Sequence, residues 1–233
     1  MMFDVIASPS PSASPAAFCF SAEGRRAPVP AAPVTLDDPA RQALAMLLPL
    51  LGCGEEAAAL AFDGIAARLG DPAATGALDV IAREEEVHDA LLRGLAETLG
   101  PTPANPALRR ARRMHVLLGR GGPALHLGRI AALDAGLCTV LSRLLAPGRP
   151  LARDPVVAPL LARIRRDETR HVRLSRGLAS DRESAATLRG VAAESRALFA
   201  SVLELGGDWF EALEVDADML VSDVRRLPTG LFA

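Results

Sequence analysis

The feature that most constrains the fold of this chain is a set of four long apolar stripes, each interrupted by acidic residues or by histidine. Within each stripe, large apolar residues recur every three or four positions, which is the spacing of one face of an α-helix. The stripes cover residues 51–69, 78–99, 127–144 and 161–178. No alternating pattern typical of strands competes with them, so we predict an all-α fold.

Turn-forming residues between the stripes indicate how the helices are connected. A Gly-Asp-Pro run at 70–72 separates the first two stripes, and a Pro-Gly-Arg-Pro run at 147–150 separates the last two. Such short breaks are expected to produce antiparallel helix pairs. The segment between the pairs is much longer and contains its own helical pattern near 106–118. We therefore predict an antiparallel four-helix bundle with one long crossover.

The regions outside the bundle differ from it in composition. Residues 1–36 are rich in Pro, Ser and Ala and are predicted to be a disordered tail. They do not show the basic region followed by an apolar stretch that is typical of a secretory signal. The bundle is assigned to residues 37–182. Two further helical stretches, near 183–205 and 208–225, predict a C-terminal helical extension over 183–233 that packs on the bundle.

Composition excludes several functional classes. The 233-residue chain has a net charge of −2 and its 26 basic residues are all Arg, so neither a nucleic-acid polycation nor a Schiff-base lysine is expected. The absence of Tyr excludes a tyrosyl radical. No run of about 18 uncharged apolar residues is present, and no membrane contact is expected. Three cysteines without a C-x-x-C pair fit neither a structural zinc site nor a disulfide framework, which favours a cytoplasmic location.

Six ionisable residues occupy stripe positions where a core requires apolar side chains. They are Glu55, Glu85, His88, Asp134, Glu168 and His171. Burying charges without partners costs on the order of several kcal/mol each. A group that compensates these charges is therefore expected between the helices.

The spacing of these residues favours a metal site as the compensating group. The E-x-x-H sequences at 85–88 and 168–171 each place a carboxylate and an imidazole on one helix face, where both can bind one ion. Glu55 and Asp134 lie 30 and 34 residues before the glutamates of these two sequences, with a turn near the middle of each interval. Each antiparallel pair thus contributes one carboxylate from its first helix and a Glu/His pair from its second.

The sequence also allows other interpretations of these buried ionisable residues. A buried ion-pair network without metal is the main alternative, although the arginines within 165–170 are out of phase with the stripe. Glu56 is an alternative to Glu55 on a less apolar face. Cys138, one turn after Asp134, fits apolar core packing better than a thiol near a metal.

Several neighbouring ionisable residues are assigned other roles. Glu84 and Glu86 are off the stripe and are predicted to be solvated. Asp89 is a candidate hydrogen-bond partner of a metal ligand. His115 and His126 are off the stripes as well, and both are predicted to be structural or surface residues.

This pattern resembles that of the ferritin-like di-iron carboxylate superfamily over roughly residues 50–180, including the Asp-Glu-x-Arg-His run at 167–171. The resemblance implies that Glu85 and Glu168 bridge two metals and that His88 and His171 each hold one metal. It also implies that Glu55 and Asp134 are terminal ligands. Asp134 departs from the Glu that is usual at its position, and its shorter side chain reaches less far.

The resemblance also implies a function. Carboxylate and imidazole ligands favour two iron ions, with manganese as the alternative. We predict a non-haem di-iron oxidase or oxygenase that activates O₂ to oxidise a small organic substrate, by hydroxylation, N-oxygenation or a similar reaction, with electrons from an external donor. The alternatives are a di-manganese, catalase-like protein that disproportionates peroxide and a non-enzymatic ferritin-like adaptor that uses the Arg-rich run at 109–113. A homodimer formed through the C-terminal extension is compatible with the sequence.

Overall fold

Long helices dominate the structure, which is a computed structural model that describes residues 32–101, 103–226 and 229–232. The prediction of an all-α fold is confirmed, because the described residues form helices, turns and loops and no strand. The four helices of the bundle are α1 (Asp38–Leu69), α2 (Pro72–Leu99), α4 (Pro123–Leu144) and α6 (Val157–Ser180).

Local sequence signals explain where the first two helices begin and end. The side chain of Asp37 accepts a hydrogen bond from Ala40 N at the start of α1, and Asp71 does the same for the first turn of α2. A proline occupies the first turn of each helix, where its missing N–H leaves no bond broken. Gly70 ends α1 with a φ of 65°, a left-handed conformation that glycine adopts without steric strain.

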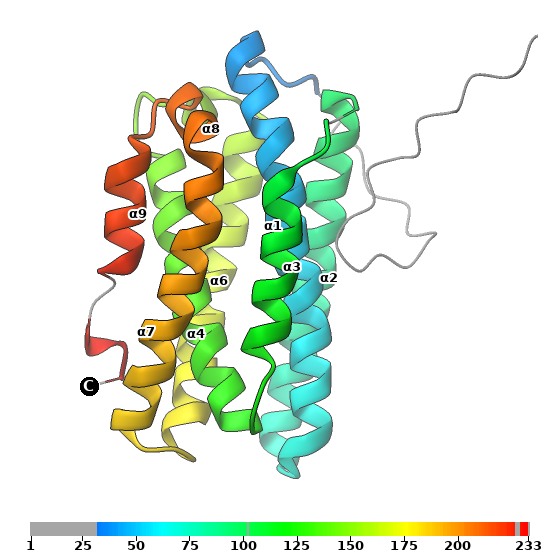
Figure 1. The fold of residues 1–233 in the computed structure, drawn as a ribbon. Coiled ribbons are helices and arrows are strands. Elements are labelled where there is room, and N and C mark those ends of the chain that lie inside the picture. The colour runs from blue at the N-terminus through cyan, green and yellow to red at the C-terminus, as the bar shows by residue number, and fades with distance from the viewer. Residues whose placement is uncertain (1–31, 102, 227–228, 233) are drawn as a thin grey trace, which may run out of the picture.

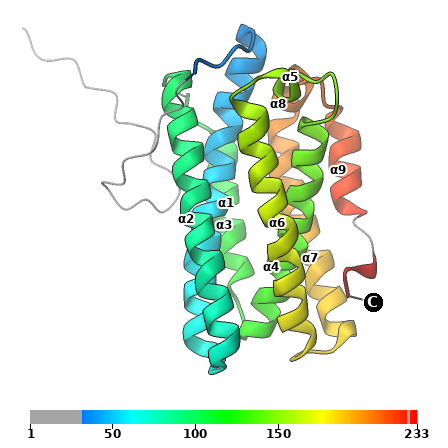
Figure 2. The ribbon, with the colours of Figure 1, turned by 180° about the vertical axis from the view of Figure 1, so that it is seen from behind.

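The helices are arranged in three layers (Figures 1 and 2). The helices α1 and α4 form the middle layer, and α2 and α6 cover one side of it. The predicted crossover helix is confirmed as α3 (Pro106–Leu118), which covers the other side together with α7 (Ala185–Leu203). A short helix, α5 (Pro150–Arg153), lies in the connection between α4 and α6. The middle helices therefore have protein on both sides.

The C-terminal segment folds against the bundle through α7, which packs on α4. Side chains of α7 pack against the backbone of α4 at Gly128, where a Cβ atom would lie 2.7 Å from Leu188 Cδ2. A 3₁₀ turn, η1 (Glu204–Gly206), follows α7, and η2 (Thr229–Phe232) ends the described part of the chain.

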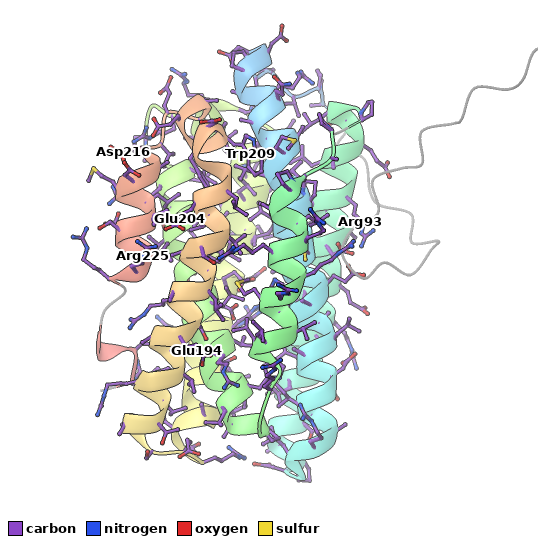
Figure 3. All side chains as sticks on the ribbon, in the orientation of Figure 1. Arg93, Glu194, Glu204, Trp209, Asp216 and Arg225 are labelled. Carbon is purple, nitrogen blue, oxygen red and sulfur yellow. The ribbon has the colours of Figure 1, made fainter. Side chains whose placement is uncertain are left out.

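The prediction of one helical stretch near 208–225 is wrong, because this segment forms two helices, α8 (Gly207–Ala212) and α9 (Ala217–Arg225). Glu214 between them has a φ of 59°, which no helix tolerates, and the chain reverses there. Arg225 at the end of α9 forms an ion pair with Glu204 (Figure 3). A further ion pair between α9 and α4 secures this helix on the bundle.

Two apolar clusters fill the opposite ends of the bundle. One contains Leu48 of α1 and Leu144 of α4, together with residues of α6, α8 and α9. The other contains Phe62 of α1 and Leu127 of α4, together with residues of α2 and α7. The six ionisable stripe residues lie between these clusters along the same helices, so the polar region is enclosed by apolar packing at both ends.

The predicted disordered tail over residues 1–36 lies mostly outside the described residues. The last residues of that segment contact the bundle. Val34 is buried, and Thr35 donates hydrogen bonds from its backbone N and its hydroxyl to Asp154 Oδ2, at 2.6 and 2.9 Å. Asp154 therefore connects the segment before α1 to the start of α6.

The two middle helices are also long and strongly apolar. Both α1 and α4 contain an 18-residue window apolar enough to cross a bilayer by length and composition, and 56% of each window is buried inside the protein. Each also carries one buried acidic residue, Glu55 or Asp134, that lies in the polar middle of the bundle. Their hydropathy is accounted for by their position between two layers of helices.

The Asp154 carboxylate is predicted to stabilise the fold in a pH-dependent way. Although burial raises its pKa, hydrogen bonds from the backbone N–H groups of Val157, Thr35 and Val156 hold that pKa below its ordinary value. A pKa that is lower in the folded chain than in the unfolded chain stabilises the fold at neutral pH, and this contribution is lost as the pH falls through the lowered pKa.

We expect Asp154→Asn to lower the free energy of unfolding by about 1–3 kcal/mol at neutral pH. The difference from the native protein should shrink as the pH is lowered through the carboxyl pKa. Urea unfolding over a pH series measures both effects, with the exposed Asp63→Asn as the control. Equal destabilisation at every pH would mean that the Asp154 charge makes no contribution.

Candidate metal centre

The six predicted site residues all lie inside the bundle. Their exposed fractions range from 0% for the two histidines to 5% for Asp134. They come from four helices: Glu55 from α1, Glu85 and His88 from α2, Asp134 from α4, and Glu168 and His171 from α6. The prediction that they share one buried region is confirmed, whereas their role as metal ligands stays a prediction.

Four of the six form a tight cluster. One ligand atom from each of Glu55, Glu85, His88 and Glu168 lies within 4.8 Å of the others. His88 Nδ1 is 3.3 Å from Glu55 Oε2, 3.2 Å from Glu85 Oε2 and 3.6 Å from Glu168 Oε1. Three carboxylates from three helices therefore surround one imidazole nitrogen.

The remaining two residues border this cluster. His171 Nδ1 lies 3.0 Å from Glu85 Oε1 and 3.6 Å from Glu168 Oε1. Asp134 is buried close enough for the charges of Glu168 and Glu85 to raise its pKa. Neither His171 nor Asp134 belongs to the group of four atoms within 4.8 Å.

Several polar atoms of the site have no hydrogen-bond partner among the described residues. They are Glu85 Oε1, Glu168 Oε1, His171 Nδ1 and Asp134 Oδ2. His171 Nδ1 and Glu85 Oε1 are 3.0 Å apart without the geometry of a hydrogen bond. Buried polar atoms without partners are rare and costly in folded proteins. Oxygen and nitrogen atoms that converge in this way fit the coordination of a cation.

Burial and the repulsion between neighbouring carboxylates raise the pKa values of two acidic residues of the site. Burial and the charge of Glu85 raise the pKa of Glu55 to about 8. Burial, followed by the charges of Glu168 and Glu85, also raises the pKa of Asp134 well above its ordinary value. The cluster therefore retains protons at neutral pH, and bound cations would take their place.

The imidazoles respond in the opposite direction. Burial alone lowers the pKa of an imidazole, yet the neighbouring carboxylates of Glu168 and Glu85 raise the pKa of His171 to about 11. The carboxylates of Glu168 and Glu55 likewise raise the pKa of His88 well above its ordinary value. Without metal, both imidazoles act as the cations of the site, and metal binding would release their protons.

The outward-facing nitrogen of each imidazole is held by a carboxylate of the opposite helix. His88 Nε2 of α2 lies 3.1 Å from Asp167 Oδ2 of α6, and His171 Nε2 of α6 lies 2.9 Å from Glu84 Oε2 of α2. Arg170 contacts both carboxylates, at 2.6 Å from Glu84 Oε2 and 3.5 Å from Asp167 Oδ1. An Nε2–H that donates to a carboxylate leaves the Nδ1 lone pair free to bind a metal.

The prediction that Glu84 is solvated is therefore wrong. Its side chain is 31% exposed, yet it is a hydrogen-bond partner of His171. The sequence contains a signal that would have identified it, because an acidic residue precedes the glutamate of both E-x-x-H sequences. Asp89, the candidate for this role, instead accepts a hydrogen bond from Arg93 at 2.8 Å, and Glu56 lies 3.8 Å from the same arginine.

The carboxylates, but not the imidazoles, form part of the wall of a cavity of about 320 Å³. Glu55, Glu85, Asp134 and Glu168 line it on one side. The other walls come from α1, α3, α4, α7 and α8 and are apolar apart from two histidines. The cavity therefore lies between the middle layer and the layer of α3 and α7.

His115 and His126 are the two histidines of the cavity wall. Their prediction as structural or surface residues missed this position, because the sequence alone did not show that α3 and α4 face one another. Cys138, by contrast, lies near Thr169 and the backbone of Arg165. Burial, with a further contribution from the charges of Glu168 and Asp134, raises the pKa of its thiol to about 11.

Comparison with known proteins identifies one solved structure with a similar fold. The chain is similar to the solved structure of a Synechococcus protein described as having aldehyde deformylating oxidase activity, with a TM-score of 0.68 and 20% sequence identity. The match covers 84% of this chain and 92% of that one. No family model and no curated protein sequence matches the chain. The similarity shows that the fold is ferritin-like, which confirms the predicted fold and resemblance.

The two outer carboxylates are predicted to tune metal binding. Because Asp167 and Glu84 orient the imidazoles, we expect Asp167→Ala or Glu84→Ala to weaken metal binding by about 10-fold to 100-fold while the helical content stays native. Competition with a chelator of known affinity measures this change. Glu86→Ala, at an exposed neighbouring position, is the matched control, and an equal loss in that variant would contradict an orienting role.

Proposed function

We propose that the protein binds two iron ions and uses O₂ to oxidise an apolar organic substrate. The observation that carries the proposal is the connection between the buried Glu/His cluster and the cavity. Four carboxylates of the cluster line a cavity of about 320 Å³ whose other walls are apolar apart from His115 and His126, whereas His88 and His171 are not part of its wall. A cluster that only balanced charges inside the bundle would not require this space.

In this proposal, the two ions would be held by the six buried residues of the cluster, which are Glu55, Glu85, His88, Asp134, Glu168 and His171. Carboxylate and imidazole donors suit iron or manganese. When bound, the iron pair supplies electrons and open coordination positions for O₂. Asp167 and Glu84 hold the imidazoles in place, and the apolar walls exclude water from the carboxylates.

The cavity favours an organic substrate over peroxide. Peroxide is small and polar and gains nothing from a long apolar wall, whereas an apolar molecule is stabilised by removal of its surface from water. The Synechococcus protein is described as having aldehyde deformylating oxidase activity, and an aldehyde is therefore one substrate class to test here. Electrons come from a separate donor protein in this proposal.

Metal content and O₂ consumption test the proposal directly. We expect about two iron ions per chain after anaerobic loading with Fe(II). In the presence of a reductant, the iron-loaded protein should consume O₂, and the rate of consumption should increase when an apolar aldehyde is added. Glu85→Ala combined with Glu168→Ala should abolish both, whereas Glu86→Ala should abolish neither. Evolution of O₂ from peroxide by the manganese-loaded protein, without any O₂ consumption by the iron form, would favour the catalase-like alternative.

A glycine in the cavity wall tests the role of the empty space. Gly54 precedes Glu55, lines the cavity and has no atom within 4 Å of the position that a Cβ would occupy. We expect Gly54→Leu to fill the cavity and to lower substrate-dependent O₂ consumption by at least about 10-fold, with metal content unchanged.

Gly64→Leu is the matched control for this change. Gly64 is in the same helix, also has open space around its Cβ position, and lies outside the cavity wall. Equal effects of the two substitutions would indicate a general effect of leucine on α1. Native substrate oxidation by Gly54→Leu would mean that the substrate does not occupy this space.

A further inference from the structure

The cavity has a second polar region in addition to the carboxylates of the metal centre. Of the residues that line it, only His115 of α3 and His126 of α4 carry other polar side chains. His126 is eight residues before Asp134 in the same helix, which places the two about 12 Å apart along the helix axis. The cavity therefore joins two polar regions through an apolar middle.

Of the two histidines in the cavity wall, His126 provides the stronger evidence for a binding role. It is only 8% exposed, and its Nδ1 has no hydrogen-bond partner within the part of the chain that the structure describes. Leaving a buried polar nitrogen unpaired destabilises a fold. A histidine that served only the packing of the bundle would be expected to have a protein partner for this atom.

The two imidazoles are uncharged at neutral pH. Burial lowers the pKa of His115 to about 4, with a further contribution from His126. Burial, together with the charges of Arg68 and Arg129, lowers the pKa of His126 to about 4 as well. A neutral imidazole has one N–H donor and one bare nitrogen acceptor, so it can bind a hydroxyl or carbonyl group without any ionic partner.

The opposite end of the cavity provides a contrast. There the wall contains Leu47, Leu144 and Phe210 and no polar side chain besides the carboxylates of the metal centre. At the histidine end, Leu60 and Val116 line the cavity and are 59% and 63% exposed, so this end lies near the surface. Apart from the carboxylates of the metal centre, polar side chains of the cavity wall are thus found only at the end near the surface.

We propose that His115 and His126 form a second recognition site for the substrate, which binds a hydroxyl or carbonyl oxygen that the substrate carries about 12 Å from its reacting group. The substrate class is then a bifunctional molecule with an apolar middle, rather than a simple alkyl chain. This inference rests on the proposed function only in placing the reacting group at the carboxylates.

The experiment compares the binding of two probes that differ in one hydroxyl group. Decanol and the corresponding terminal diol are titrated into the purified full-length protein by calorimetry, and the ratio of their dissociation constants is measured for the native chain and for His126→Phe. Phenylalanine keeps the ring and removes both nitrogens. We expect the preference for the diol to fall about 10-fold in the variant, since the second hydroxyl loses its partner in a buried site.

Two further variants make the result specific. His126→Gln retains a donor and an acceptor and should keep a preference within about 3-fold of the native one. Ile130→Val, one turn further along the same cavity face, should leave the ratio unchanged. If His126→Phe does not fold, as judged by circular dichroism, His115→Phe takes its place. A ratio that stays within about 2-fold of native in the folded phenylalanine variant overturns the proposal.

The measurement is independent of turnover. Binding of the two alcohols requires neither O₂ nor a reductant, so the outcome separates this inference from the proposed function. A shifted ratio in a protein that consumes no O₂ would retain the recognition site and reject the oxygenase. An unshifted ratio in a protein that oxidises aldehydes would reject the recognition site alone.

Discussion

The burial of six ionisable side chains in the middle of an apolar bundle is the constraint on which the rest of the structure depends. Four carboxyl groups face two imidazoles, so even two protonated imidazoles leave the cluster short of positive charge. Desolvation makes that shortage costly and raises the pKa of Glu55 and Asp134 accordingly. The two apolar clusters at the ends of the bundle provide the packing that compensates for this region.

The two outer layers of helices have different structural roles, because one supplies and orients the imidazoles and the other borders the cavity. The helices α2 and α6 supply both imidazoles and the outer carboxylates that orient them, and they close one side of the centre. The helices α3 and α7 cover the other side without filling it, which leaves the cavity against the carboxylates. Middle helices with protein on both sides must be apolar nearly all round, which explains why α1 and α4, among the helices that the structure describes, are the two apolar enough to cross a bilayer by length and composition.

Sequence patterns predicted those properties that depend on one helix or one turn. The four stripes, the Gly-Asp-Pro turn and the crossover helix follow from periodicity and capping, and the six buried residues follow from their phase on the stripes. The sequence marks Glu84 and Asp167 by their matching positions before the glutamates of the two E-x-x-H sequences, but the histidine that each one contacts depends on the rotation of α2 relative to α6. The cavity and the position of His126 depend on how α3 lies across α4, which is a property of tertiary packing. The break at Glu214 rests on one backbone angle that local propensity does not encode.

The crossed hydrogen bonds make the centre a property of the assembled bundle rather than of either hairpin. The hairpin of α1 and α2 contains an E-x-x-H sequence, but the carboxylate that orients its histidine, Asp167, belongs to α6. Likewise, His171 belongs to α6, whereas Glu84, the carboxylate that orients it, belongs to α2. In an isolated hairpin of α1 and α2, His88 Nδ1 would keep its contacts with Glu55 and Glu85, but Nε2 would lose the carboxylate that orients the ring for metal binding. Docking of the two hairpins supplies both missing partners at once, and Arg170 bridges the two outer carboxylates across the interface. Since each half completes the other, loss of packing between α2 and α6 should disorder both imidazoles together, so the stability of this helix pair and the affinity for metal are coupled.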